Sequence, residues 1–221
     1  MPEGLISING ESVQTLEILL LTTLITLLPS LVVMMTSFTR YVVSFSFLRS
    51  AMGTQQTPPN MVLVGLALFL TLLTMNPVLR QIQTEAYEPY KADEITQEEF
   101  LDRAAVPLKE FMLRNTETET LQMFCELAHI DPPANGEQAK QLSLTVIVPA
   151  FMTCELKAAF TIGFLLYIPF VLIDIVVSST LMSMGMIMLP PSMISAPFKL
   201  LLFVSVNGWQ LLFSTLVQSV R

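Results

Sequence analysis

The sequence predicts an all-α, membrane-associated protein built from polytopic helical hairpins, and three observations lead to this fold class. Of its 221 residues, 52% are hydrophobic and only 13% are charged, whereas soluble domains carry about 25% charged residues. Several stretches without a charged side chain approach or exceed the roughly 20 apolar residues of a spanning helix. No segment shows the two-residue alternation of a half-buried strand. The uncharged stretches are Ile18–Thr39, Ser50–Leu79, Ala158–Ile173, Ile175–Phe198 and Leu200–Val220.

Charge divides the chain into three units. Residues 81–140 contain thirteen acids and five bases, so this segment has a net charge of −8 while the rest of the chain is +1. We expect residues 1–80 to form N-terminal helices with a long kinked apolar hairpin. Residues 141–221 should form a C-terminal apolar hairpin with a methionine-rich loop. The acidic unit should be helical and outside the bilayer, and its charge excludes nucleic acid as a partner because phosphates would repel it.

The first unit should contain two long apolar helices. The first apolar segment spans Thr15–Leu48 and contains Pro29, which should kink or break the helix. The loop Gly53–Asn60 has two consecutive prolines, which favour extended backbone before them. A second apolar segment follows at about Met61–Leu79, and we expect Pro77 and Arg80 to mark its end.

Basic residues near the first loop predict the orientation in the membrane. Arg40 and Arg49 flank this loop, and Lys and Arg favour the cytoplasmic side. Residues 40–60 should then be cytoplasmic and residues 81–140 periplasmic. The N-terminus would lie outside the cytoplasm as well. It has no basic region typical of a signal peptide, so either no such peptide exists or the chain is a mature form. An N-terminus outside the cytoplasm would require a cleaved signal peptide, which agrees with a mature chain.

The acidic unit has the pattern of short amphipathic helices. Thr96 can begin a helix with Glu99 at the reciprocal position of a capping box. Apolar residues recur at spacings of three and four over Phe100–Met112, and again over Thr116–Ala128, before a Pro-Pro turn. We expect a small helical rim that is too short for a large core of its own.

The last unit should fold as a helical hairpin. We expect a helix at Ala150–Val177, a loop through the methionines and a final helix at Phe198–Val220. A hairpin with its tip at the Met186–Ile187 bond places Asp174 and Lys199 at equal distances from the tip. A charge inside hydrocarbon persists mainly where it faces protein or water, so these two should neutralise each other. Alternatively, Lys199 extends to an interface and Asp174 pairs elsewhere.

Four methionines alternate across seven residues at the tip of this hairpin. A loop at membrane depth persists only where it is buried in protein or lines a cavity. The unbranched thioethers could close around a passing polypeptide. Methionine also fills irregular cores, so plain packing stays open as the alternative. The four residues are Met182, Met184, Met186 and Met188.

The residues that could support enzymatic chemistry do not form a site. The sequence lacks the HExxH, GxSxG, Walker A and paired CxxC patterns, so we expect no enzyme, cofactor or metal. The single histidine, His129, should be a surface or cap residue beside a Pro-Pro turn. Cys125 and Cys154 lie in different contexts, which argues against a disulfide.

Four long blocks of the sequence are distinctive. They are SFTRYVVSFSFLRSAMGTQQTPPNMVLVGLALFLT (Ser37–Thr71), PAFMTCELKAAFTIGF (Pro149–Phe164), IPFVLIDIVVSSTLMSMGMIMLPP (Ile168–Pro191) and PFKLLLF (Pro197–Phe203). The chain resembles the FliP family, the flagellar branch of the type III secretion export gates, over nearly its whole length after about Leu28. The resemblance implies a gate at the centre of the flagellar basal body in the bacterial inner membrane.

The resemblance also implies partners and residue roles. The chain would assemble with FliQ, FliR and further FliP copies, as a pentamer in the family, beside FlhB and FlhA of the export apparatus. Unfolded rod, hook and filament subunits would be the exported proteins. The middle gasket position, often methionine in the family, is a stiffer β-branched isoleucine here. The implied positions are Met186, Ile187 and Met188 for the pore gasket, and Glu155, Asp174 and Lys199 for a buried charge network.

Two other functions stay open at this point. A secondary transporter could use Asp174, Lys199 and Glu155 as an ion relay. Glu155 and Lys157 point to different faces of a helix, however, so at most one of them faces a lipid-free interior. A transporter should also show paired halves with similar interrupted helices, and no such repeat is visible. An intramembrane hydrolase would need a nucleophile and a base that the sequence does not supply as a pair.

Overall fold

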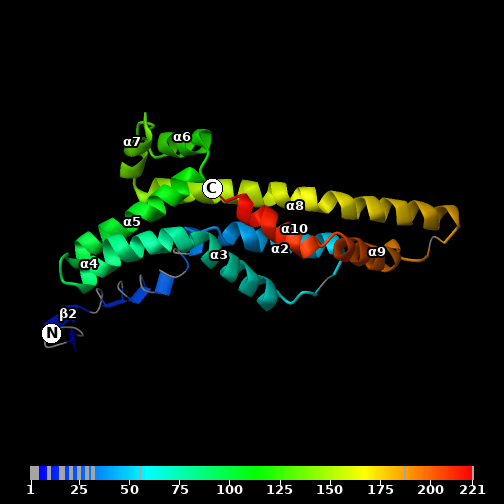
Figure 1. The fold of residues 1–221 in the computed structure, drawn as a ribbon, viewed down its shortest axis with the longest axis horizontal. Coiled ribbons are helices and arrows are strands. Elements are labelled where there is room, and N and C mark those ends of the chain that lie inside the picture. Colours follow the sequence, from blue (N-terminus) through cyan, green and yellow to red (C-terminus); the bar gives the residue numbers. More distant parts are fainter. Residues whose placement is uncertain are drawn as a thin grey trace.

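The computed structural model describes residues 5–8, 11–14, 18–19, 22–23, 26–27, 30, 33–54, 56–186 and 188–220. They form an elongated, mostly helical molecule in which one long helix, α8, runs along the longest axis (Figure 1). The all-α fold class predicted from the sequence is confirmed. The helical elements are α2 (Phe38–Met52), α3 (Asn60–Ile82), the π-helical turn η1 (Gln83–Tyr87), α4 (Glu88–Lys91), α5 (Gln97–Arg114), α6 (Thr118–Leu127), α7 (Gly136–Gln141), α8 (Leu144–Ser183), α9 (Pro191–Ser205) and α10 (Gly208–Gln218).

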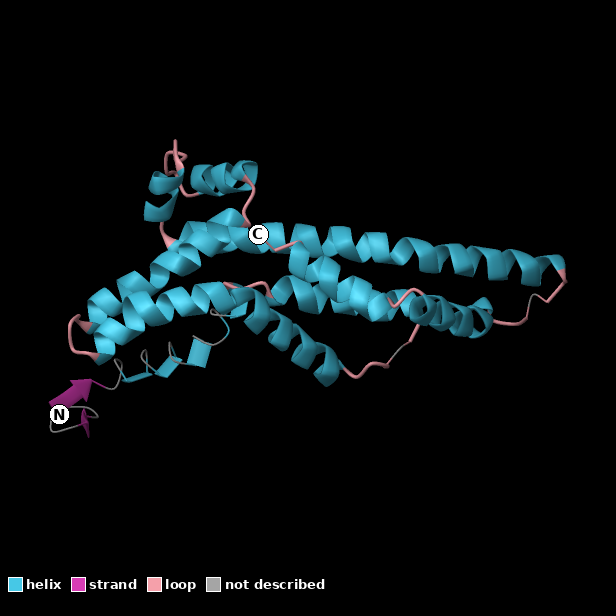
Figure 2. Cartoon of the chain, viewed as in Figure 1, coloured by secondary structure: helices cyan, strands magenta, loops and turns pink. Residues whose placement is uncertain are grey.

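Two short strands precede the helices. The strands β1 (Leu5–Ile8) and β2 (Glu11–Gln14) pair in antiparallel fashion (Figure 2). This hairpin was not predicted, although the sequence contains Asn9-Gly10, a dipeptide that is strongly favoured in two-residue hairpin turns. The kink predicted at Pro29 lies outside the described residues.

Helix α3 covers the predicted segment Met61–Leu79 and continues past Pro77 and Arg80 to Ile82, so the end predicted there comes too early. Proline removes one backbone hydrogen bond, but its φ of about −65° is itself helical. A long helix can therefore continue although this one hydrogen bond is missing. The chain runs on through η1 and α4, which makes Asn60–Lys91 a single stretch of 32 residues. This stretch and Leu144–Ser183 are each long and apolar enough to cross a membrane, and α9 with α10 would make a third span if the bent pair counts as one.

The acidic unit contains the predicted capping box. Thr96 Oγ1 accepts a hydrogen bond from the Glu99 backbone N–H at 3.3 Å, and the Glu99 carboxylate accepts one from the Thr96 N–H at 3.0 Å. The helix predicted at Thr116–Ala128 is present as α6. The short helix α7 was not predicted. It begins after Asn135, whose side-chain oxygen accepts a hydrogen bond from the backbone N–H of Gln138.

Helix α8 is longer than the predicted Ala150–Val177. It has 40 residues, because Ser143 caps its start and the two prolines inside it, Pro149 and Pro169, do not interrupt it. The helix therefore reaches from the acidic unit to the far end of the molecule (Figure 1).

The single final helix predicted at Phe198–Val220 is wrong, because the structure has two helices there. The axes of α9 and α10 differ by 65°. The break lies at Asn207, whose φ of 51° is left-handed. The next residue is Gly208, and a Cβ at this position would overlap the ring of Phe203, so the glycine lets that ring pack against the backbone.

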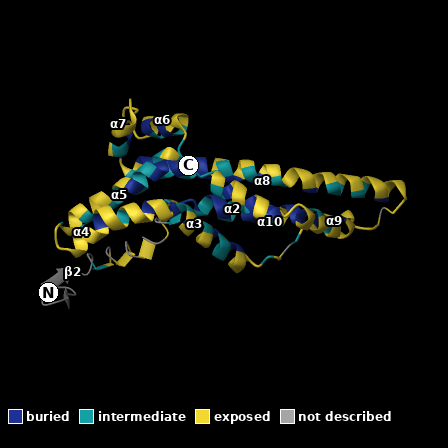
Figure 3. Cartoon of the chain, viewed as in Figure 1, coloured by how far each residue is buried: buried dark blue, intermediate teal, exposed yellow. Residues whose placement is uncertain are grey.

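Buried side chains gather in two clusters, and a large part of α8 and α9 lies outside both (Figure 3). The first cluster joins α5, α6 and the start of α8 around Phe111 and Phe151. The second joins α2, α3 and α10 around Tyr41 and Phe45. Large exposed apolar patches mark contact with protein or membrane. Exposed apolar residues of the hairpin include Leu172, Ile175, Val176, Met193 and Leu201.

Candidate functional site

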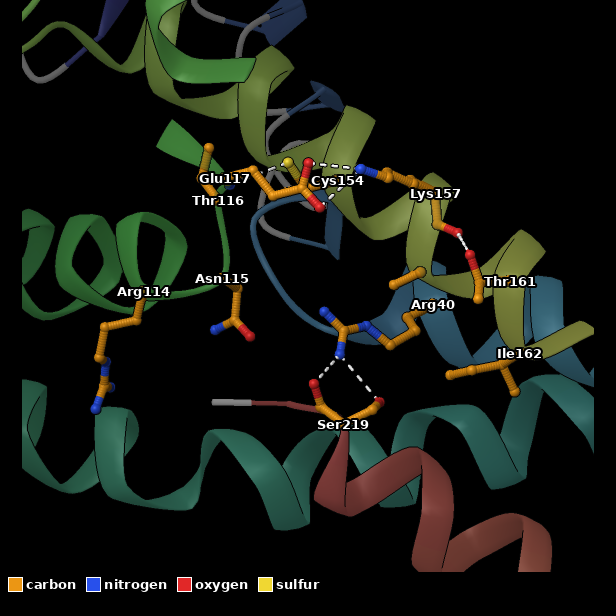
Figure 4. Close-up of a pocket in the computed structure, with 11 residues that line it drawn as sticks. Arg40, Arg114, Asn115, Thr116, Glu117, Cys154, Lys157, Thr161, Ile162 and Ser219 are labelled. Atoms are coloured by element: carbon orange, nitrogen blue, oxygen red, sulfur yellow. Dashed lines mark hydrogen bonds and ion pairs between the residues drawn. The ribbon is translucent and has the colours of Figure 1, made fainter. Parts of the chain in front are cut away.

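The most buried ion pair among the described residues joins α2 to α8. Arg40 donates to both carboxylate oxygens of Glu155, with an Nε–Oε2 distance of 2.9 Å, and the two side chains are 4% and 0% exposed. The Arg40 Nη1 also donates to the carbonyl oxygen and to the Oγ of Ser219, just after α10 (Figure 4). This two-point arrangement is the strong form of arginine–carboxylate pairing, and one cation thus connects three helices.

From the sequence, Arg40 was expected only to mark the cytoplasmic side. Arg40 lies in the first turn of α2, at the opposite end of this helix from the loop Gly53–Asn60. Its charge is compensated by Glu155, so only Arg49 in the last turn of α2 is left to mark the cytoplasmic side. A signal for the pairing was available. Arg40 follows the uncharged stretch Ile18–Thr39, and Glu155 interrupts another apolar segment. Opposite charges in two apolar helices could have been matched on this basis.

A second ion pair joins α8 to α9. The Lys199 Nζ lies 2.6 Å from Asp174 Oδ2 and donates to the Ala51 carbonyl oxygen at 3.1 Å, so it also contacts the end of α2. The pairing predicted across the hairpin is therefore present. The Lys199 side chain is 8% exposed in the single chain, whereas that of Asp174 is 40% exposed. Glu155 is not part of this contact, so the three predicted charges belong to two separate pairs.

A third pair lies on another face of α8. Lys157 Nζ is 2.8 and 2.7 Å from the two carboxylate oxygens of Glu117, the residue that precedes α6, and both side chains are exposed. Glu155 is buried two positions away, so the expectation that these neighbours face different ways is confirmed. Both carboxylates of α8, Glu155 and Asp174, are held in ion pairs, which does not favour an ion relay along this helix.

The methionine loop forms the tip of the α8–α9 hairpin, at the right of Figure 1. Met182 lies in the last turn of α8, and Gly185 turns the chain with a left-handed φ of 75°. The side chains of Met186 and Met188 are 40% and 99% exposed. Ile187, the middle residue of the predicted gasket, lies outside the described residues. The described methionines of the loop are therefore not core residues of their own chain.

The remaining candidates occupy ordinary structural positions. His129 lies just after α6, its side chain is exposed, and its backbone has a left-handed φ of 55°. Cys125 and Cys154 are both buried and free, as predicted. Within the part of the chain that the structure describes, no group of three or more His, Cys, Asp or Glu side chains could hold a metal ion.

Comparison with known proteins identifies the family of this chain. A model of the FliP family matches residues 20–216. The chain belongs to the FliP family. It is similar to the flagellar biosynthetic protein FliP of Aquifex aeolicus, with 49% identity over 213 residues that cover 96% of this chain and 89% of the relative.

Two further FliP relatives come from other bacteria. The FliP protein of Pectobacterium carotovorum is 51% identical over 213 residues, covering 96% of this chain and 81% of the relative. That of Bacillus subtilis is 49% identical over 205 residues, covering 93% and 91%. The resemblance to FliP drawn from the four sequence blocks is confirmed, and the chain is a flagellar biosynthetic protein with membrane helices.

Proposed function

We propose that this chain is a core subunit of the flagellar type III protein export gate. With FliQ and FliR it would form the channel through which unfolded rod, hook and filament subunits are exported. The observation that carries the proposal is the α8–α9 hairpin. Its helices are held together by Asp174 and Lys199, yet its outer surface and its methionine tip are exposed in the single chain.

Assembly would give the hairpin the contacts that it lacks alone. Exposed apolar surface of this extent is covered by protein or lipid in a functioning molecule. Several copies placed around one axis, with FliQ and FliR, would cover the sides of the hairpins and bring their tips together. The family implies five copies, with FlhB and FlhA as neighbours in the export apparatus.

The methionine tips would then close the passage. Thioether side chains repack around different neighbours because they are unbranched and polarizable. An apolar constriction excludes water and ions while no polypeptide is in transit. Met186 and Met188 are the described residues of this proposed gasket, and Ile187 would complete it.

The proposed location is the bacterial inner membrane, with residues 81–140 on the periplasmic side. Helices α5, α6 and α7 would form a rim between neighbouring copies. Glu98, in the first turn of α5, is exposed and suits a test. A Glu98→Cys variant in intact cells should react with a membrane-impermeant maleimide added from outside. Labelling only after the inner membrane is opened would contradict this topology.

The decisive experiment weighs the complex. The chain is coexpressed with FliQ and FliR, purified in detergent and examined by native mass spectrometry. A large particle that contains several copies of this chain and both partners is expected. A monomer or a dimer that never associates with FliQ and FliR would overturn the gate and would favour the transporter considered above.

A further inference from the structure

A cationic pocket lies where the acidic unit meets the apolar hairpin. Its volume is about 340 Å³, and it lies between the α5–α6 turn, α8 and the end of α10 (Figure 4). Arg114 contributes from the last turn of α5, Lys157 from α8 and Ser219 from the residue after α10. The pocket thus brings together side chains from three separate parts of the chain.

The charges of this pocket do not cancel. Arg40 is neutralised by Glu155, and Lys157 is neutralised by Glu117. Arg114 makes no ion pair with any residue that the structure describes. The five groups together carry one net positive charge. A guanidinium has five N–H donors and binds phosphate groups readily, so a ligand with one negative phosphodiester complements the pocket.

An apolar groove continues from this pocket along the seam between α8 and α10. Its volume is about 240 Å³, and its lining is apolar except for Thr215. Ile162 lines both the pocket and the groove, and Thr215 lies one helical turn before Ser219 of the pocket. The polar and apolar cavities are therefore neighbours along one seam. The groove residues are Ile162, Leu165, Leu166, Leu211, Leu212 and Thr215.

The sequence of α8 changes character at the same level. Lys157 is followed by the uncharged stretch Ala158–Ile173. A phospholipid has the same arrangement, with an anionic phosphodiester linked through glycerol to two acyl chains. Basic groups at a membrane surface attract anionic lipids, and acyl chains gain free energy from every buried methylene group.

We propose that this seam binds one anionic phospholipid, with its phosphodiester at Arg114 and an acyl chain in the α8–α10 groove. The site recognises the headgroup by charge and the chain by apolar contact. It involves neither the methionine loop nor the Asp174–Lys199 pair. The proposal concerns the single chain, so it does not depend on the proposed export gate.

The test uses the full chain in nanodiscs that contain a phosphatidylglycerol with a photoactivatable diazirine on one acyl chain. Cross-links mapped by mass spectrometry should fall on the groove, at Ile162, Leu165 and Leu211. The Arg114→Gln variant should reduce this labelling about five-fold, the effect of one basic group near a charged lipid surface. Arg103→Gln is the matched control, because Arg103 is exposed on the same helix, loses the same charge and does not line the pocket.

A second pair of variants tests the acyl chain. Leu165→Ser should also reduce labelling, whereas Phe164→Ser should not. The two residues are neighbours with similar exposure, 61% and 68%, but only Leu165 lines the groove. An unchanged circular dichroism spectrum of each variant shows that the fold is kept.

The remaining arms separate the possible occupants. Equal labelling by a phosphatidylcholine with the same chain would overturn the role of charge. Full displacement by soluble glycerol phosphate would show that the pocket recognises the anion alone, which overturns the role of the lipid. Labelling that is lost when copies of the chain assemble would assign the seam to a neighbouring subunit and would overturn the proposal.

Discussion

Arg40 and Glu155 lie 115 positions apart in the chain, and their side chains form a two-point ion pair that is almost completely shielded from solvent. The pair joins α2 to α8, and through Ser219 it also holds the end of α10. Apolar contacts alone would fix the relative positions of these helices less specifically. Removing one partner would leave an uncompensated charge in apolar surroundings.

This relationship predicts a strong asymmetry between single and double variants. Arg40→Met and Glu155→Leu should each lower the free energy of unfolding by about 3–5 kcal/mol, because each leaves a buried charge unpaired. The double variant should be clearly more stable than either single variant, because both positions are then apolar. Thermal unfolding of the purified chain in detergent measures this.

The control for that series is Glu117→Gln. It removes a carboxylate from the exposed pair with Lys157, and exposed pairs contribute about 0–1 kcal/mol. A double variant whose loss of stability equals the sum of the two single losses would show that Arg40 and Glu155 act independently.

The hairpin pair predicts an unequal response at Asp174 and Lys199. Asp174→Ala leaves the nearly buried Lys199 ammonium with only the Ala51 carbonyl oxygen as a described partner. Lys199→Ala leaves a carboxylate that is still partly exposed. Both variants should impair stability or assembly, and Asp174→Ala should do so more strongly. Thermal unfolding and the yield of complex with FliQ and FliR measure the two effects.

Exchanging the two charges tests the pairing itself. The double variant Asp174→Lys with Lys199→Asp should recover part of the loss, because the ion pair can form again in the opposite sense. Single variants that assemble and unfold as the wild type does would rule out a structural role for this pair.

Shortening the methionines of the hairpin tip should let ions leak through the gate without preventing its assembly. Met186→Ala with Met188→Ala shortens two exposed side chains at the hairpin tip, so the helix contacts should persist while the proposed seal loosens. Entry of ions or small molecules into cells that express the gate should rise, and export should continue or fall only modestly. Unchanged leakage in a complex shown to be fully assembled would favour plain packing.

The buried position of Cys125 predicts that its thiol reacts slowly with alkylating reagents. Burial raises the pKa of the Cys125 thiol, so at neutral pH it stays protonated, and the thiolate is the reactive form. In a Cys154→Ser background, alkylation by iodoacetamide should be slow in the native chain. It should become fast in denaturant, which serves as the control. Fast alkylation of the native chain would show that α6 opens away from α8.

Some features follow from short stretches of sequence, and these were predicted. The capping box of Thr96 and Glu99 depends on residues three positions apart, so it can be predicted from the sequence without knowledge of the fold. The lengths of the apolar stretches follow from composition. Even the contact of Asp174 with Lys199 could be predicted, because a hairpin with a known tip brings residues equally distant from it to the same level.

Other features depend on which surfaces meet, and they are fixed only by packing between segments that are far apart in the chain. Arg40 and Glu155 can be recognised from the sequence as charges in apolar segments, but their pairing requires α2 and α8 to pack side by side. Pro77 and Arg80 were predicted to mark a helix end, but α3 continues through both to Ile82. The break at Asn207 arises where the Phe203 ring packs on Gly208. Local sequence sets the preferences of each segment, whereas packing between distant segments supplies the energy that overrides them.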